Sequence, residues 1–452
     1  MSDLEGIVRT GLERGLSNRE ISNRICEELL FYKKLTREKC ERISEIILEE
    51  VLNSLKTCSS SHKEFFCVEG SGVSAGLMGV GSRGFGDFFF HRLLTQINPI
   101  NTEGTAVELD DAGWIKIGDK WIIVAVDGIH SRLAYFPLLA GFHAARAAAR
   151  DVLVKGGVVS GFLVDLRLAD DGDVEYLLEL EAGVAAVSKF LGAPILGGST
   201  LRIGGDMVIG RRLVATVFAV GVSDTRPRSR RGFRVGDKLI MTEGIGGGTV
   251  ATTAIFSGKI DIALKTINFK TISLLKRLIE SRYIEYVNSL FDVTNGGLRG
   301  DLNEISRINN IGFYVRYSDI ERVIDPDVLN MLRELNIDPL GLSLDSIVLS
   351  IDPHRAEDLL SFIRGLGLKA EIIGEVINKP EVLIEYEGSR VAKLEPKYRE
   401  SAYTKIKKFV GEESPENLEE ILSRVEKSFY RAIKLRDELY NYAIKRTFQI
   451  FS

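Results

Sequence analysis

Four aspartates stand next to the ends of expected strands and helices, a position from which carboxylates can hold a metal ion. Asp110 and Asp111 precede one expected strand, Asp127 follows an apolar run in the next, and Asp151 ends an alanine-rich helix. Mg²⁺ prefers oxygen ligands on a rigid support, which the end of a buried strand provides. The alternative is that Asp127 begins a turn, Asp110 and Asp111 belong to a solvated loop, and Asp151 is a surface charge. The pattern alone leaves both interpretations open.

Three glycine-rich segments offer backbone N–H groups that can bind phosphate. Residues 79–84 fit G-x-G-x-x-G without a preceding strand, so an anion-binding loop with Arg83 is favoured over a dinucleotide-binding turn. Residues 244–248 follow a strand and lead into a helix, whose N-terminus favours anions, but they lack the ending of a P-loop. Residues 197–200 form a third expected turn. One such turn is usually only a turn, whereas three beside several carboxylates favour phosphate chemistry.

The segment from Asp292 to Gly297 places a carboxylate, a hydroxyl and two glycines directly before an expected helix. Because glycine permits sharp bends, this loop can bring its carboxylate, hydroxyl and backbone amides to one side of a cleft. Leu302 and Ile305 are expected on the inward face of the helix. Of the five histidines, only His130 lies close in sequence to a candidate site residue. It is either a general base or a packing or substrate-contact residue.

The order of expected elements predicts two α/β domains flanked by helical segments. Apolar residues recur at helical spacing to about residue 57, and Ser17 with Glu20 has the form of a capping box. After a Ser- and Gly-rich stretch, short β-rich runs alternate with helical runs to about residue 225. A basic cluster marks the start of a second mixed segment, and the end of the chain is helical and charged. The expected divisions are residues 1–62, 63–228, 229–395 and 396–452.

Composition excludes several classes of function. The chain of 452 residues is long enough for two or three domains, and its net charge of −4 gives no basic surface for nucleic acid. No apolar run is long enough to span a bilayer and the N-terminus lacks an apolar signal core, so we expect no membrane partner and a cytoplasmic location. The cysteines match no zinc or redox spacing and are expected to be thiols in a reducing compartment. They are Cys26, Cys40, Cys58 and Cys67.

An ordered set of motifs resembles a known superfamily. Residues 291–306 resemble the D-P-T-R-G-G-L-x-x-x-L-N-E-I segment of HypE-type hydrogenase maturation factors. The surrounding chain resembles the wider superfamily of aminoimidazole ribonucleotide synthetase (PurM), selenophosphate synthetase and thiamine-monophosphate kinase. The resemblance covers about residues 75–390 and leaves both helical ends out. Its other motifs are Asp110-Asp111-Ala112, Asp127 at a strand end, Gly141 through Asp151 to Gly156, residues 197–200, Gly236-Asp237 and residues 370–376.

The resemblance implies an enzyme that uses ATP and Mg²⁺ to phosphorylate or activate a small-molecule acceptor. It implies two PurM-like α/β domains with helical extensions at both ends. The first domain contributes its sheet to a β-barrel in a homodimer, and the second has a mixed sheet with flanking helices. By resemblance, Mg²⁺ is held by Asp110, Asp111, Asp127 and Asp151. The candidate catalytic residues are Asp127 and Asp292, together with His130, which is a candidate because of its position near Asp127. Nucleotide and phosphate contacts fall on Ser82, Arg83, Gly84, Gly86, Gly197, Gly198, Thr200, Gly244, Gly246, Gly247, Thr294, Gly296 and Gly297.

Departures from the family pattern leave a second function open. Ser199 replaces the usual Asp or Glu, Asn295 replaces an Arg, and Ala148 with Arg150 replaces an Asn. The sequence ends without the terminal Cys of HypE-type factors, and Cys67 lacks the surroundings of the reactive Cys of selenophosphate synthetase, so neither activity is expected. The alternative is a nucleotide-binding regulator or maturation scaffold without turnover, whose helical ends bind a protein partner. An NAD enzyme rests only on the G-x-G-x-x-G match and is disfavoured.

Overall fold

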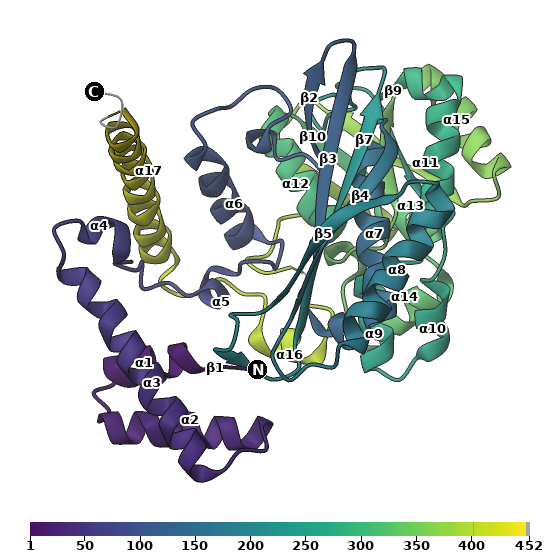
Figure 1. The fold of residues 1–452 in the computed structure, drawn as a ribbon. Coiled ribbons are helices and arrows are strands. Elements are labelled where there is room, and N and C mark those ends of the chain that lie inside the picture. Colours follow the sequence, from purple (N-terminus) through teal and green to yellow (C-terminus); the bar gives the residue numbers. More distant parts are fainter. Residues whose placement is uncertain (401, 449–452) are drawn as a thin grey trace.

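The computed structural model describes residues 1–400 and 402–448 and contains two large β-sheets with helices packed around them (Figure 1). The N-terminal helices pack around an apolar core of their own. The predicted capping box is present, because Ser17 and Glu20 exchange side-chain and backbone hydrogen bonds. Strand β1 pairs with β6, which attaches this helical segment to the connection between β5 and β7. The bounds are β1 (Ser2–Asp3), α1 (Leu4–Glu13), α2 (Asn18–Tyr32), α3 (Arg37–Lys56) and β6 (Val208–Ile209).

The prediction of four free thiols is wrong for one pair of cysteines. Cys58 and Cys67 form a disulfide, nine residues apart in the sequence. The chain turns back on itself between them and brings their Cα atoms to 5.3 Å, a separation that a disulfide requires. Cys26 and Cys40 are free and buried, as expected. Cysteine usage therefore no longer supports a reducing compartment.

The first large sheet has five strands in the order β2-β3-β7-β4-β5. Neighbouring strands are antiparallel, except that β4 and β5 are parallel. Helices α7 and α8 cover one face, and α7 also packs against α9, α11 and β9 of the second half. One continuous apolar core therefore joins the two halves. The bounds are β2 (Gly113–Ile117), β3 (Lys120–Ile129), β4 (Val158–Leu168), β5 (Ile195–Arg202), β7 (Leu213–Ser223), α7 (Pro137–Val154) and α8 (Glu175–Leu191).

The other face of this sheet, called the open face below, exposes apolar side chains. Along β3 the side chains alternate, with Ile123 and Ala125 buried beneath the helices and Val124 and Val126 exposed on the opposite side. Strand pairing places Phe218 of β7 beside Val126 on the same face. The apolar residues exposed on the open face are Ile115, Ile117, Val124, Val126, Val158, Leu163, Leu196, Leu201 and Phe218.

The second large sheet has seven strands in the order β14-β13-β10-β12-β8-β11-β9. It is mixed, because β10 and β13 are parallel while the other neighbours are antiparallel. The strands predicted near residues 237–243, 345–352, 370–376 and 381–388 are present as β8, β11, β12 and β13. The bounds are β8 (Lys238–Thr242), β9 (Val287–Asp292), β10 (Gly312–Arg316), β11 (Ile347–Ile351), β12 (Ala370–Ile377), β13 (Val382–Tyr386) and β14 (Arg390–Lys393).

Helices surround the second sheet and include the three predicted near residues 268–280, 300–308 and 355–365. The fold is therefore the predicted mixed α/β architecture, while the exact domain divisions remain a prediction. The helices are α9 (Gly248–Phe256), α10 (Ile260–Lys265), α11 (Lys270–Glu280), α12 (Gly297–Asn309), α13 (Tyr317–Val323), α14 (Pro326–Glu334) and α15 (Pro353–Gly365). The 3-10 helices are η1 (Thr57–Ser59), η2 (Ala106–Glu108), η3 (Arg132–Tyr135), η4 (Arg282–Tyr286), η5 (Pro339–Gly341) and η6 (Glu387–Ser389).

The C-terminal segment returns to the region between the N-terminal helices and the first sheet. Helix α17 packs along α6, and the two stand side by side in Figure 1. None of the described helices is both long and apolar enough to cross a bilayer. Residues 449–452, where the terminal Cys of HypE-type factors was sought, lie outside the described residues. The remaining helices are α4 (Lys63–Phe66), α5 (Ala75–Met78), α6 (Phe85–Ile97), α16 (Lys405–Val410) and α17 (Leu418–Phe448).

Candidate functional site

Helix α7 carries two arginines into the interior between the two large sheets. Most of its alanines are fully buried, and such small side chains allow the helix to pack closely. Arg146 and Arg150, one helical turn apart, find their partners in the second half of the molecule. Arg150 pairs with Asp292 at 2.5 Å and also with Asp345, while Arg146 lies 2.6 Å from Asp345. These buried ion pairs connect α7 to the end of β9 and to the loop before β11.

Asp110 and Asp111 belong to a second buried cluster that contains two cations. Lys155, just beyond α7, lies 2.5 Å from Asp110 and 2.7 Å from Asp111. Arg230 contacts Asp111 and lies 3.4 Å from Asp301 of α12. Burial alone would raise the pKa of Asp111, but the charges of Arg230 and Lys155 outweigh it and lower that pKa. Side chains of the protein itself therefore neutralise these two predicted metal ligands.

Three other aspartates lack sufficient positive charge around them. The pKa of Asp127 is raised to about 6, chiefly by burial, although the Gly128 amide and Arg150 oppose the shift. Burial raises the pKa of Asp151 well above its ordinary value, and the charge of Asp292 adds to the shift. Burial also raises the pKa of Asp292, despite its pair with Arg150. The charges of Asp292, Asp111 and Asp127 all raise the pKa of Asp151, so a cation bound beside Asp151 would be stabilised.

Asp127 and Asp151 fit a magnesium ion better than the other predicted ligands do. Neither side chain forms an ion pair with another described residue. The buried Oδ1 atom of Asp292 also lacks a hydrogen-bond partner in the described part of the chain. Among residues 1–400 and 402–448, no three His, Cys, Asp or Glu side chains are placed to hold a metal by themselves. Two carboxylates suffice for Mg²⁺, which is commonly bound by one or two of them together with water and substrate phosphates.

The predicted loop at residues 79–84 lies against the loop that follows β9. Ser82 and Arg83 are half-buried there. The Nε atom of Arg83 donates to Asn295 O and its Nη2 atom donates to Thr294 Oγ1, both at 3.3 Å. Gly296 has a φ of +100°, and a Cβ atom there would lie 2.7 Å from Arg83 O, so only glycine fits. The fold therefore unites two predicted phosphate-binding segments that are distant in sequence.

Most backbone amides at this loop already have acceptors. Asp87 accepts hydrogen bonds from two of them. Phe85 and Gly86 donate their N–H groups to two consecutive carbonyls of the C-terminal segment, at 2.9 and 3.2 Å. A Cβ atom at Gly84 would lie 2.4 Å from Tyr398 O, so glycine permits this close approach. The predicted contacts of Gly84 and Gly86 with phosphate remain a prediction.

The loop before α9 joins the same region. Gly244 and Gly246 donate their N–H groups to carbonyls within the second half. Gly247 directly precedes α9, and in the first turn of that helix Thr249 Oγ1 donates to Asn295 Oδ1 at 2.6 Å. Asn295, which stands where the family pattern has Arg, thus connects the loop before α9 with the loop after β9.

The remaining predicted site residues have no described hydrogen bond or ion pair with Asp127, Asp151 or Asp292. They are Gly197, Gly198, Thr200 and His130. The turn predicted at residues 197–200 is wrong, because these residues lie inside β5 and pair with β4. Glycine is needed at position 198, where a Cβ atom would lie 2.0 Å from Val164 O. The predicted roles of Gly197, Gly198 and Thr200 remain untested. His130 is exposed just beyond β3, and its pKa is lowered by partial burial and by nearby positive charges.

The sequence patterns do not predict the cations of these clusters, which are Arg146, Arg150, Lys155 and Arg230. For Arg146 and Arg150, the sequence does contain a pattern that could have predicted them. Arg146 and Arg150 are four residues apart in an alanine-rich helix, which places both on one face. Arg230 lies in a basic cluster that is interpreted from the sequence as the boundary before the second mixed segment. Its burial depends on α12, far along the chain, and no local pattern reports that contact.

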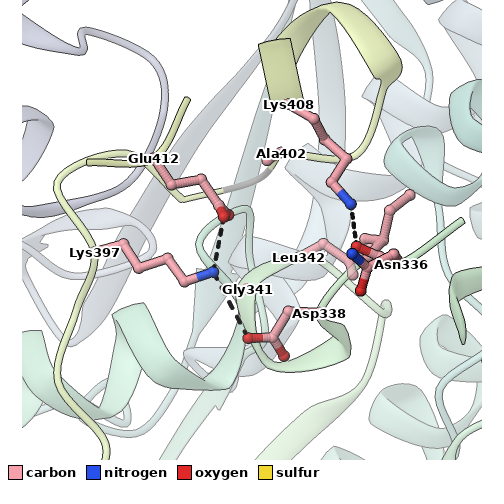
Figure 2. A pocket seen from close by; sticks show the side chains of 9 residues that line it. Asn336, Asp338, Gly341, Leu342, Lys397, Ala402, Lys408 and Glu412 are labelled. Carbon is pink, nitrogen blue, oxygen red and sulfur yellow. Dashed lines mark hydrogen bonds and ion pairs between the residues drawn. The ribbon is translucent and has the colours of Figure 1, made fainter. Parts of the chain in front are cut away.

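A separate cavity of about 260 Å³ lies between the loop at residues 336–342 and the C-terminal segment (Figure 2). Most of its charged lining is internally paired, since Lys397 Nζ lies 2.9 Å from Glu412 and 4.0 Å from Asp338, and Lys408 donates to the backbone oxygens of Leu335 and Asn336. Arg299 of α12 also pairs with Asp338. Because these charges satisfy one another, the aspartate cluster is the stronger candidate for a site that binds a charged ligand.

Two α/β halves that share a core helix, with an acidic site between them, define the class of this protein. Family models agree with that division. Residues 109–223 match the N-terminal domain and residues 234–387 the C-terminal domain of AIR synthase related protein. The chain therefore belongs to the AIR synthase related family.

Relatives cover most of the chain. An uncharacterised protein of Methanocaldococcus jannaschii is 41% identical over 97% of this chain and 97% of its own length. The HypE–HypF complex structure has a TM-score of 0.54 at 20% identity and covers 66% of this chain and 96% of that one. AaThiL complexed with AMPPCP and TMP has a TM-score of 0.53 at 16% identity and covers 69% and 96%. At these identities the two structures support the fold alone.

Proposed function

We propose that this chain is an ATP- and Mg²⁺-dependent enzyme that phosphorylates or activates a small-molecule acceptor. The observation that carries the proposal is that Arg150, the neighbour of Asp151 in α7, pairs with Asp292, two residues before the Thr294 that Arg83 contacts. Asp127 and Asp151 have no ion-pair partner among the described residues, so they favour a divalent cation, while the Arg83 guanidinium favours phosphate oxygens. A nucleotide triphosphate with its metal ion supplies both partners.

Different residues of this site can bind the metal ion, bind the phosphates and accept a proton during phosphoryl transfer. Mg²⁺ held by Asp127 and Asp151 would offset the negative charge of the phosphates. Arg83 is anchored by Thr294 and the backbone of the next residue, and it retains donors for a phosphate. Asp292 is oriented by Arg150, and its Oδ1 atom has no hydrogen-bond partner among the described residues. That atom can accept a proton from the attacking group of an acceptor.

Family membership supports the nucleotide as ligand. One similar structure is that of AaThiL complexed with AMPPCP and TMP. The family pattern also places its carboxylates where Asp127 and Asp151 stand. No feature of the described site identifies the acceptor, which we propose to be a small molecule because the site lies between two buried ion-pair clusters.

Calorimetric titration of the full chain tests this proposal. ATP is expected to bind in the presence of Mg²⁺ and to lose most of its affinity when EDTA removes the metal, because the phosphates would then face uncompensated carboxylates. NADH serves as a control nucleotide and is expected not to compete. Failure of ATP to bind with Mg²⁺ present would overturn the proposal.

The second candidate is a nucleotide-binding regulator or maturation scaffold without turnover. Asn295 favours it, because this residue stands where the family pattern has Arg and is engaged by Thr249. Exposed apolar side chains on α17, including Tyr430 and Tyr440, would suit a protein partner. Measuring ADP release with candidate acceptors separates the two functions. Binding of ATP with only background ADP release across all acceptors favours the regulator.

We also propose that two copies of the chain pair through the open face. A sheet face with this much exposed apolar surface is unusual for a monomer, and a second copy would bury it. Light scattering after gel filtration is expected to give twice the chain mass. Phe218→Glu should shift it to the mass of one chain, because the new charge would be buried at the interface. Val235→Glu, an exposed apolar position in the loop before β8, is the matched control and should stay dimeric. A wild-type chain of single mass would contradict the proposal.

A further inference from the structure

The Asp110 carboxylate has no acceptor position left for a metal ion. Its Oδ1 atom accepts from the Asp111 amide at 3.0 Å and lies 2.5 Å from Lys155 Nζ. Its Oδ2 atom accepts from Ser229 Oγ at 2.9 Å and from the Arg230 amide at 2.8 Å. A carboxylate offers about four acceptor positions, and protein donors fill all of them here.

Asp111 faces the same lysine, although its buried Oδ2 atom has no hydrogen-bond partner among the described residues. Lys155 Nζ lies 2.7 Å from its Oδ2 atom, and Arg230 contacts its Oδ1 atom. Both the lysine and the aspartate are fully buried. Two carboxylates therefore face one ammonium and one guanidinium.

The ammonium of Lys155 contacts three oxygen-bearing partners. Its Nζ atom lies within ion-pair distance of Asp110 and Asp111, and it donates to the backbone oxygen of Leu290 in β9 at 3.0 Å. A divalent cation at this pair of aspartates would have to displace Lys155. The displaced ammonium would then remain buried with only the Leu290 carbonyl as its partner, which is unfavourable for a charged group.

We propose that Lys155 permanently occupies the Asp110–Asp111 pair, where the family pattern places metal ligands, and that Asp127 and Asp151 hold the divalent cation without them. The second clause rests on the proposed function, whereas the first does not. Lys155 is a positioning residue, because it fixes the charge of the pair and ties the end of α7 to β9. The chain would thus bind fewer divalent cations with its nucleotide than its aspartates suggest.

Counting bound Mn²⁺ by electron paramagnetic resonance, with AMPPCP present, tests which aspartates hold the cation. Asp110→Asn should keep the Mn²⁺ affinity and stoichiometry of the wild type, because its carboxylate serves only Lys155 and its neighbours. Asp127→Asn should weaken Mn²⁺ binding by about tenfold or more. Loss of Mn²⁺ in Asp110→Asn comparable to that in Asp127→Asn would overturn the inference.

A variant without the lysine charge tests the first clause, and no nucleotide is needed. Lys155→Met leaves the two aspartates with Arg230 alone, so this variant should bind one more Mn²⁺ per chain and melt at a higher temperature when Mn²⁺ is added. Lys155→Arg keeps the charge and should gain neither property. A folded Lys155→Met variant that gains no Mn²⁺ would overturn the inference. If that variant does not fold, the Asp110→Asn result decides alone. Absence of nucleotide binding by the wild type would instead contradict the proposed function and leave the Lys155→Met result decisive.

Discussion

Replacing Arg230 with methionine is expected to lower the free energy of unfolding by about 3–5 kcal/mol. The guanidinium is almost fully buried, contacts Asp111, and lies 3.4 Å from Asp301 and 3.3 Å from Glu304. Methionine fills similar space but leaves these carboxylates facing one another without a counter-charge. Even with Arg230 present, the pKa of Asp301 is raised to about 7, chiefly by burial, so little further negative charge can be tolerated.

Arg231→Met is the matched control. The neighbouring Arg231 is half-exposed and pairs with Glu108 near the surface, so its loss should cost about 0–1 kcal/mol. Guanidinium chloride unfolding at pH 7, followed by circular dichroism, measures both variants. Equal losses for the two arginines would show that the cluster around Arg230 does not stabilise the fold as its burial suggests.

Substituting Asp127 with asparagine is expected to weaken Mg²⁺-dependent nucleotide binding by about 10- to 100-fold. The amide keeps the shape of the side chain and can still interact with the Gly128 amide, but it lacks the negative charge that attracts the metal ion. Binding of nucleotide measured without Mg²⁺ should change little, because that residual affinity does not depend on a ligated metal. Calorimetry with AMPPCP, with and without Mg²⁺, separates the two effects.

Asp119→Asn is the control for this substitution. Asp119 is exposed in the turn directly before β3, the strand that carries Asp127, so the same chemical change there should leave nucleotide binding intact. Unchanged Mg²⁺-dependent affinity in Asp127→Asn would remove Asp127 from the metal site. A simultaneous fall in thermal stability would instead point to a structural role, which the melting temperature of each variant reports.

The elements of this fold follow from local sequence, because their signals lie within a few residues. The short β-rich apolar run that ends at Asp127 predicts β3, because such runs bounded by turn residues are typical of buried strands. Ser17 and Glu20 predict the start of α2, because a capping box satisfies the first N–H groups of a helix. The motif order also predicts the family, since it records which loops follow which strands.

Where the sequence misleads, a contact between residues that are not neighbours in the sequence is responsible. Gly197 and Gly198 have the composition of a turn, yet pairing with β4 keeps them extended. Cys58 and Cys67 match no familiar spacing, and only the turn between them brings their sulfur atoms together. Local propensity is weak beside such contacts.

The sequence by itself determined that this chain has two α/β halves with aspartates at strand and helix ends. Only the tertiary structure decided which of those aspartates are free to bind a cation. Lys155 and Arg230 neutralise Asp110 and Asp111, whereas Asp127 and Asp151 have no ion-pair partner among the described residues. The reason is physical: charge balance at a buried carboxylate depends on groups within a few ångströms in space, and those groups lie far apart along the chain.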